Sequence, residues 1–310
     1  MNAEAPNRER KAEMPSELKV AVIGLDTSHA VDYQRYFHAL DCPKDQRVEG
    51  LRVERCLRFE TPFQNGEGLD GRQRQLERWG VQVTESFDDA VRGCDAIMMT
   101  INDPSLHLQN FRKCARLGKP IFLDKPLADT FANGELILAE ARKRGGHFFS
   151  ASSLRFVRQL EEACREVPKP TACTVYGPLG KAPAGSSIVW YGVHAFEMLQ
   201  RAMGNGAQSV VTTTDGSGAV AMIRYGDGRR GVVELTEDSP LYGGTLRTKE
   251  EAFPFVVDKG RVYPDLLLRM AEFFHGGEPP VPAEATREIM GMLDAAERSS
   301  QSGREEPTRL

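Results

Sequence analysis

Lys125 stands where a lysine side chain can do chemistry. It follows the apolar run Ile121–Leu123 and Asp124, and it precedes Pro126. The run is typical of a buried strand in a parallel sheet, and ligands bind at the carboxyl ends of such strands. A lysine there can hydrogen-bond a substrate oxygen and shift the pKa of a neighbour. The alternative is a surface lysine paired with Asp124. We favour a catalytic role.

A second cluster surrounds His194. Trp190, Tyr191 and Glu197 accompany it, and on a helix His194 shares a face with Glu197 and with Trp190. The unperturbed pKa of histidine lies near neutrality, which suits proton transfer. Two aromatic side chains can line a sugar site, and a carboxylate can fix the tautomer of the imidazole. A lone histidine on a helix more often has a structural role, but the aromatic and acidic residues beside His194 favour a role in proton transfer.

The turn after the first strand contains a third group. Gly24, Asp26, Thr27, Ser28 and His29 stand where dinucleotide-binding folds carry G-x-G-x-x-G, with Asp26 and His29 replacing the second and third glycines. A carboxylate about 5 Å from a phosphate charge costs roughly 3 kcal/mol at an effective dielectric near 20. Free amides at the start of a helix oppose that cost. These residues are predicted to contact a dinucleotide. At least one of Asp26, Thr27 and Ser28 is expected to cap the helix.

Two further residues are predicted to face the cofactor. Asn102 follows the apolar run at residues 95–101, and Asp124 ends the next one. A nicotinamide lying along the strand ends would pass Asn102. Turn formation by an Asn-Asp-Pro sequence accounts for Asn102 equally well.

Strands that alternate with helices are expected to position these residues. Up to about residue 150, apolar runs alternate with helical patterns, which indicates a parallel, doubly wound sheet. The expected strands are 19–24, 51–57, 81–83, 95–101, the run that begins at Ile121, and 148–150. The expected helices are 29–40, 73–79, 86–92, 106–117 and 132–144, and residues 61–72 are expected to form a loop.

After about residue 153 the pattern changes to strands separated by short turns, which favours a mainly antiparallel sheet. Strands are expected at 171–175, 209–214, 219–225, 230–236 and 253–257, and helices at 191–203, 264–274 and 283–299. The chain is therefore predicted to be an α/β protein. We expect a disordered tail (1–17), a dinucleotide-binding domain (18–152) and a domain for substrate and oligomerisation (153–310).

Composition excludes several classes of protein. The chain has 310 residues and a formal net charge of -4, so charge gives no case for nucleic acid or an anionic membrane. No apolar run approaches the roughly 20 residues that span a bilayer, and the polar N-terminus does not look like a secretion signal. The six cysteines are scattered without a C-x-x-C pair. Reduced thiols in a cytoplasmic protein are therefore expected, with no metal site.

Taken together, these motifs resemble the Gfo/Idh/MocA oxidoreductase family. Asp124-Lys125-Pro126 resembles its Glu-Lys-Pro motif and is preceded by a matching segment, Ala115–Pro120, and by His107. Ser153–Phe156, with Arg155, resembles the segment that leaves the last dinucleotide-domain strand. Gly192–Glu197 resembles G-x-H-x-x-D, with glutamate as the last residue. The resemblance runs from Lys19 to about residue 200, and the sequence is similar to a poorly characterised branch.

The resemblance implies a Rossmann domain followed by an α/β domain with a large open sheet, often used to form oligomers. It implies NAD or NADP as cofactor and a sugar, polyol or related substrate. Lys125 would polarise the reacting hydroxyl and His194 would take its proton. Arg155, Trp190, Tyr191 and Glu197 would contact the substrate. Arg58 would favour NADP and Glu60 would favour NAD, which leaves the choice open.

Two departures from the family pattern keep alternatives open. The glycine fingerprint is mostly lost, and Trp190 replaces an aspartate that members often carry four residues before the histidine. The first motivates an inactive ligand-binding or regulatory protein on the same scaffold. The second motivates an NAD-dependent sugar lyase or hydrolase with no net redox change. The main hypothesis remains an NAD(P)-dependent oxidoreductase.

Overall fold

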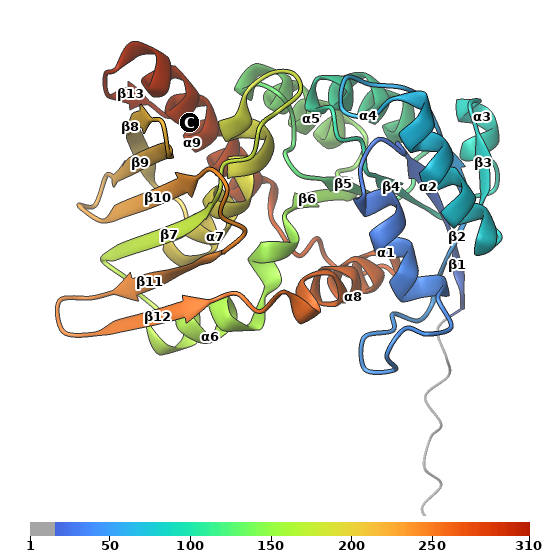
Figure 1. Cartoon of the computed structure of the whole chain (residues 1–310), viewed down its shortest axis with the longest axis horizontal. Helices are drawn as coiled ribbons and strands as arrows, with labels where there is room; N and C mark the ends of the chain where they lie inside the picture. The colour runs from blue at the N-terminus through green and yellow to red at the C-terminus, as the bar shows by residue number, and fades with distance from the viewer. Residues whose placement is uncertain (1–15) are drawn as a thin grey trace, which may run out of the picture.

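The computed structural model describes residues 16–310 and contains two sheets. Figure 1 shows the sheet of the N-terminal half beside the sheet of the C-terminal half, with helices around both. The predicted disordered tail, residues 1–17, lies outside the described residues except for its last two. None of the helices in residues 16–310 is long and apolar enough to cross a bilayer.

The first sheet has six parallel strands in the order β3-β2-β1-β4-β5-β6. Its strands are β1 (Leu18–Ile23), β2 (Leu51–Leu57), β3 (Gln82–Thr84), β4 (Ala96–Met99), β5 (Ile121–Asp124) and β6 (Phe148–Ala151). This is the doubly wound Rossmann order, so the predicted N-terminal fold is confirmed. Every residue of β4, β5 and β6 is buried, because helices cover both faces.

The helices of this half lie on the two faces of the sheet. They are α1 (His29–His38), α2 (Gly66–Arg78), α3 (Phe87–Ala90), α4 (His107–Ala115) and α5 (Phe131–Lys143). Buried residues of α1 and α2 share one apolar cluster, and those of α3, α4 and α5 belong to the other.

The predicted loop at residues 61–72 is wrong, because α2 already begins at Gly66. Asn65 caps it by accepting a hydrogen bond from a backbone amide of the first turn. Leu69 and Leu76 lie seven residues apart and are fully buried. Packing of this apolar stripe outweighs the low helix propensity of the glycines.

The second sheet has seven strands in the order β12-β11-β7-β10-β9-β8-β13. Its strands are β7 (Ala172–Pro178), β8 (Ala207–Asp215), β9 (Gly218–Tyr225), β10 (Arg230–Thr236), β11 (Gly243–Arg247), β12 (Ala252–Val256) and β13 (Glu306–Pro307). Only β7 and β10 pair in parallel, so the predicted mainly antiparallel sheet is confirmed. The sequence did not predict β11, which begins with two glycines, or the two-residue β13.

Four helices accompany this sheet in the chain. They are α6 (Arg158–Glu166), α7 (Val193–Met203), α8 (Val262–Phe274) and α9 (Ala283–Ser302). α7 packs on β7 and β10, α9 packs on β8, and α6, which was not predicted, packs beside β11 and β12. α8 returns to the first sheet, where Leu266 and Met270 share an apolar cluster with Phe122 and α1. α8 thereby ties the C-terminal half to the first sheet (Figure 1).

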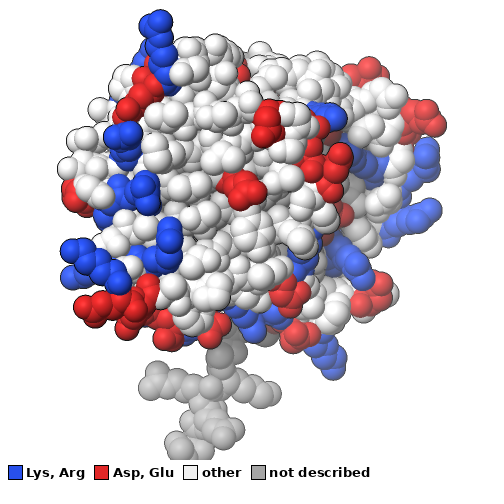
Figure 2. All heavy atoms as spheres, turned by 60° about the vertical axis from the view of Figure 1, so that its left-hand side comes forward, with Lys and Arg blue, Asp and Glu red and all other residues white. Residues whose placement is uncertain are grey.

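The other face of the second sheet carries apolar side chains that no helix covers. On β9, Val220 is 47% exposed and Met222 is half-buried, and Val232 of β10 is half-buried. Figure 2 looks toward this side of the molecule and shows a mostly uncharged area that contains a few acidic side chains and is bordered by further lysines, arginines and acids.

Candidate active site

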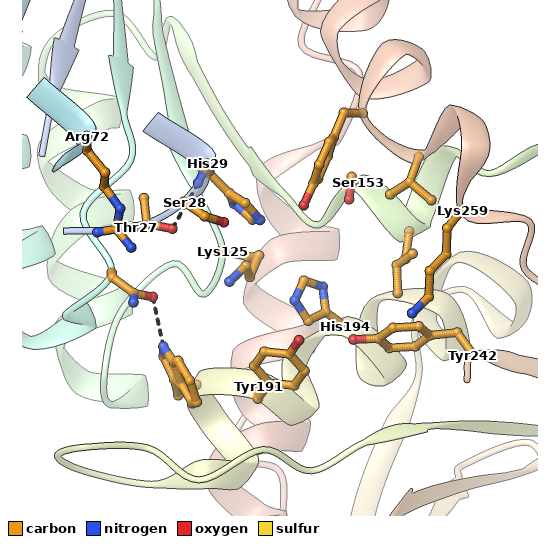
Figure 3. A pocket seen from close by; sticks show the side chains of 15 residues that line it. Thr27, Ser28, His29, Arg72, Lys125, Ser153, Tyr191, His194, Tyr242 and Lys259 are labelled. Atoms are coloured by element: carbon orange, nitrogen blue, oxygen red, sulfur yellow. Dashed lines mark hydrogen bonds between the residues drawn. The ribbon is translucent and has the colours of Figure 1, made fainter. Parts of the chain in front are cut away.

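A cavity of about 500 Å³ lies between the two sheets, where the carboxyl ends of β1, β4, β5 and β6 meet α7 and α8 (Figure 3). It is lined by Thr27, Ser28, His29, Arg72, Asn102, Lys125, Ser153, Leu154, Trp190, Tyr191, His194, Tyr242, Lys259, Val262 and Tyr263. The carboxyl edge of an open parallel sheet is the usual place for a ligand.

Lys125 and His194 share this cavity, although one follows β5 and the other lies on α7 (Figure 3). Each side chain is largely buried, at 7% exposure. Burial lowers the pKa of Lys125, and the neighbouring Asp124 opposes the shift. Burial, and then the positive charge of Lys125, hold the pKa of His194 well below 6.5. His194 is therefore neutral at pH 7 and able to accept a proton.

Ser152, and not Glu197, contacts the imidazole of His194. The Oγ of Ser152 lies 2.7 Å from Nδ1 of His194. Glu197 instead accepts a hydrogen bond from the Ser152 amide at 3.0 Å and forms a buried ion pair with Arg155 at 3.2 Å. The expectation that Glu197 orients the histidine directly is corrected. The short side chain of Ser152 stands between the two.

Arg155 and Glu197 do not line the cavity. Both side chains are buried, at 6% and 2% exposure, and their ion pair fastens the end of β6 to α7. Burial raises the pKa of Glu197, and Arg155 opposes that shift. Their contact with substrate stays a prediction, and the structure gives them a positioning role.

Asp26 is turned away from the cavity. Its carboxylate accepts hydrogen bonds from the amides of Asn102 (2.9 Å) and Asp103 (3.3 Å) and from the hydroxyl of Thr61 (2.9 Å). Burial raises its pKa, and these donors oppose the shift. The acidic side chain therefore fastens the first turn to the loop after β4.

Gly24 keeps its role in the turn, although it does not line the cavity either. It has a φ of 103°, and a Cβ there would lie 2.9 Å from the backbone of Ile101. Its predicted cofactor contact, like that of Asp26, stays a prediction.

Thr27 and Ser28 do lie at the cavity. The Thr27 hydroxyl accepts a hydrogen bond from the amide of His29 at 3.3 Å, so the predicted capping is confirmed for this residue. Ser28 is exposed, and its side chain makes no capping bond. Arg72 of α2 approaches the same end, where it donates to the carbonyl of Leu25 at 3.0 Å.

His29 and Asp124 form a buried pair. Nδ1 of His29 lies 2.5 Å from Oδ2 of Asp124 and 3.0 Å from the hydroxyl of Tyr33. Burial alone would raise the pKa of Asp124, but His29 and Lys125 hold it at about 2. Asp124 lies behind the cavity wall and orients His29, which lines it. The predicted contact of Asp124 with the cofactor stays a prediction.

Asn102 and Trp190 connect the two halves of the protein. Nε1 of Trp190 donates to Oδ1 of Asn102 at 2.9 Å. The sequence predicted an α-helix from Tyr191 onward, whereas Ile188–Gly192 is a π-helical turn and α7 begins at Val193. Such turns are frequent at functional sites, and this one places both aromatic residues on the cavity wall.

Several lining residues were not predicted. They are Arg72, Ser153, Leu154, Tyr242, Lys259, Val262 and Tyr263. Lys259 and Tyr263 flank the start of α8 and reach the cavity because that helix returns to the first sheet. No motif in the sequence marks Lys259 or Tyr263, and Arg72 fell within the segment taken for a loop. Ser153 and Leu154 belong to the segment Ser153–Phe156, of which only Arg155 was predicted as a site residue.

Comparison with known proteins supports this description. Residues 66–152 match the Gfo/Idh/MocA model, an oxidoreductase family with an NAD-binding Rossmann fold. GenD2 of gentamicin A biosynthesis, in complex with NAD, superposes with a TM-score of 0.79 at 15% identity over 98% of this chain and 100% of that one. No curated protein sequence matches the chain.

Two further solved structures are similar. The myo-inositol 2-dehydrogenase of Lactobacillus plantarum has a TM-score of 0.77 at 14% identity, with 94% of this chain and 99% of that one covered. The WlbA dehydrogenase of Bordetella pertussis, in complex with NADH and UDP-GlcNAcA, has a TM-score of 0.75 at 14% identity, with 95% and 99% covered. At such identities the likeness establishes the fold.

The fold and the matched segment define an α/β protein with an N-terminal Rossmann fold of the NAD-binding type and a second, mainly antiparallel sheet. The resemblance to the Gfo/Idh/MocA oxidoreductase family is confirmed: residues 66–152 carry its sequence pattern, and the chain as a whole has the fold of inositol dehydrogenases and related oxidoreductases.

Proposed function

We propose that this protein is an NAD(P)-dependent oxidoreductase that transfers hydride to or from a sugar, polyol or related carbohydrate. The observation that carries the proposal is the meeting of Lys125 and His194 in one cavity with the first turn of the Rossmann domain. A cation and a neutral imidazole beside a nucleotide-type sheet edge are what oxidation of an alcohol requires.

The residues at one end of the cavity fit a dinucleotide. Thr27 and Ser28 lie at the start of α1, where the helix dipole favours a pyrophosphate. Arg72 adds a positive charge, while the Asp26 carboxylate is occupied by amides of the protein. The replacement of the second glycine by aspartate therefore places no carboxylate on the cavity wall. Bound NAD(P)+ would supply the hydride acceptor there.

The chain's own residues would prepare the substrate oxygen. The Lys125 ammonium donates a hydrogen bond to the reacting hydroxyl and stabilises negative charge on it. When Nδ1 of His194 donates its proton to Ser152 Oγ, Nε2 is left to take the hydroxyl proton. Trp190 and Tyr191 offer aromatic surface to a sugar ring. Inositol dehydrogenases among the solved structures support a polyol or sugar as the substrate.

The direct test begins with cofactor binding. The purified full-length protein is titrated with NADH and with NADPH, and quenching or a shift of their fluorescence at micromolar protein is expected. Failure of both to bind, with a sugar still bound in calorimetry, would favour the ligand-binding scaffold instead.

Turnover then tests Lys125. Lys125→Ala should reduce turnover of an active sugar or polyol at least about 100-fold, because the oxyanion loses its stabilising cation. Lys119→Ala, which removes a lysine just before the amino end of the same strand, serves as the control, with circular dichroism to confirm folding. Unchanged turnover in Lys125→Ala would remove Lys125 from the mechanism.

A redox-neutral lyase or hydrolase remains a second candidate, because Trp190 replaces a carboxylate and is held by Asn102. Steady accumulation of NADH together with product excludes it.

A further inference from the structure

The cavity wall carries basic side chains and no acidic ones. Among its residues there is no Asp or Glu, and its basic side chains are His29, Arg72, Lys125, His194 and Lys259. A cleft lined by one sign of charge concentrates ligands of the other sign. The ligands that bind in this cavity are therefore expected to be anionic.

Two carboxylates close to this wall are paired within the protein. Asp124 is buried against His29, and Asp26 is buried against backbone amides. Asp124 offsets in part the positive charge of Lys125. Arg72 and Lys259 remain as positive groups at the cavity with no acid beside them on its wall.

These two cations lie at opposite ends. Figure 3 shows Arg72 beside Thr27 and Ser28, and Lys259 beside Tyr242 on the far side of His194. The pyrophosphate of the proposed cofactor accounts for the positive charge of Arg72. It does not account for that of Lys259, which lies where a substrate would extend beyond Lys125 and His194.

The surroundings of Lys259 suit an anion. Its ammonium lies 5.8 Å from the centre of the Tyr242 ring. In residues 16–310 the lysines that form ion pairs are Lys19 and Lys181, so Lys259 has no carboxylate partner there. Burial raises the pKa values of Tyr242 and Tyr263, so both hydroxyls stay protonated, and that of Tyr242 hydrogen-bonds Tyr191. An unpaired ammonium at the cavity wall is a suitable site for a carboxylate or a phosphate.

We propose that Lys259, at the end of the cavity lined by Tyr242, binds an anionic group of the substrate. The substrate is then a sugar acid or a sugar phosphate and not a neutral sugar. This inference rests on the proposed function, because Lys125 and His194 define where the reacting carbon lies.

Calorimetry with three ligands that share one ring tests the proposal. The full-length protein, saturated with NADH, is titrated with D-glucose, D-glucuronate and D-glucose 6-phosphate. At least one of the two anions should bind about ten- to a hundredfold more tightly than glucose, as a charged hydrogen bond requires. The glucuronate and phosphate titrations distinguish the two sources of charge. Equal affinities, or no binding of either anion, would overturn the proposal.

Variants assign the effect to Lys259. Lys259→Gln should remove the preference for the anion, and Lys259→Arg should keep most of it. Lys249→Gln, an exposed lysine between β11 and β12, is the matched control and should change nothing. A preference that survives in Lys259→Gln would refute the assignment.

The same titrations without NADH separate this proposal from the proposed function. If NADH does not bind but an anion does, in a way that depends on Lys259, the oxidoreductase proposal fails and the anion site stands. If NADH binds and no anion is preferred, only the anion site fails.

Discussion

Single residues in this cavity work through partners that are distant in the sequence. His194 is buried, and its Nδ1 faces a serine hydroxyl where a carboxylate was expected. The serine is itself fixed, because its amide donates to Glu197 and its Oγ accepts from the amide of Leu154 at 3.1 Å. Ser152 is thus a positioning residue that selects the ring orientation of His194 without touching the substrate.

We predict that Ser152→Ala lowers kcat about tenfold with little change in KM, since a positioned general base contributes roughly 100- to 10,000-fold and only part of its alignment is lost. The neutral, proton-accepting form of His194 persists below pH 6.5 because its pKa is depressed. The wild-type acidic limb of kcat should therefore lie below pH 6.5. Loss of the Ser152 contact should move that limb.

Kinetics over pH 5–9 measure both effects, with Ser152→Thr as the conservative variant that retains the hydroxyl. An equal loss in both variants, without a change in the pH profile, would indicate a structural role only.

Whole elements show which parts of the protein could be predicted from sequence. The strands β4, β5 and β6 were found because buried parallel strands are continuous apolar runs. α2 was predicted to start too late, because its first turns are rich in glycine and only Leu69 and Leu76 mark the buried face.

The residues of the candidate site likewise include some that the sequence could predict and some that it could not. Lys125 and His194 were predictable, since each stands in a local motif. The inward turn of Asp26 was not, because its partners are amides more than seventy residues away. Lys259 and Tyr263 join the site through the return of α8 to the first sheet, which no local pattern records.

α2 also bears on the choice of cofactor. Arg58, just after β2, would meet a 2′-phosphate, but its guanidinium lies 2.6 Å from Asp70 and 2.6 Å from Gln73 of α2. Asp70 therefore competes with the phosphate for Arg58. We predict that Asp70→Asn raises the affinity for NADPH relative to NADH, by up to about fivefold for a half-exposed pair.

Fluorescence titrations of both cofactors measure this ratio. Asp88→Asn, an exposed acid on α3, is the control. A ratio unchanged by Asp70→Asn would mean that Arg58 does not contact the 2′ position.

At the scale of the whole molecule, the open face of the second sheet is the feature that the fold leaves unexplained. Seven strands about 4.8 Å apart span roughly 29 Å, enough for a standard interface of about 800 Å² per partner. The face presents Val220, Met222 and Val232, with the exposed Glu234 of the central strand opposite Val220. Exposed apolar side chains grouped on an open sheet are a feature of interaction surfaces. We propose that two copies of the chain pair through it.

Val220→Asp should therefore convert the oligomer to a monomer, because pairing would bury two facing carboxylates without partners. Size-exclusion chromatography with light scattering measures the molar mass, which should fall to the 34.4 kDa of one chain. Leu136→Asp is a matched control, since Leu136 is 46% exposed on α5 and Val220 is 47% exposed. It should leave the mass unchanged. A wild-type protein that already elutes at the mass of one chain would refute pairing through this sheet. An oligomer that persists in Val220→Asp would place the interface on another surface.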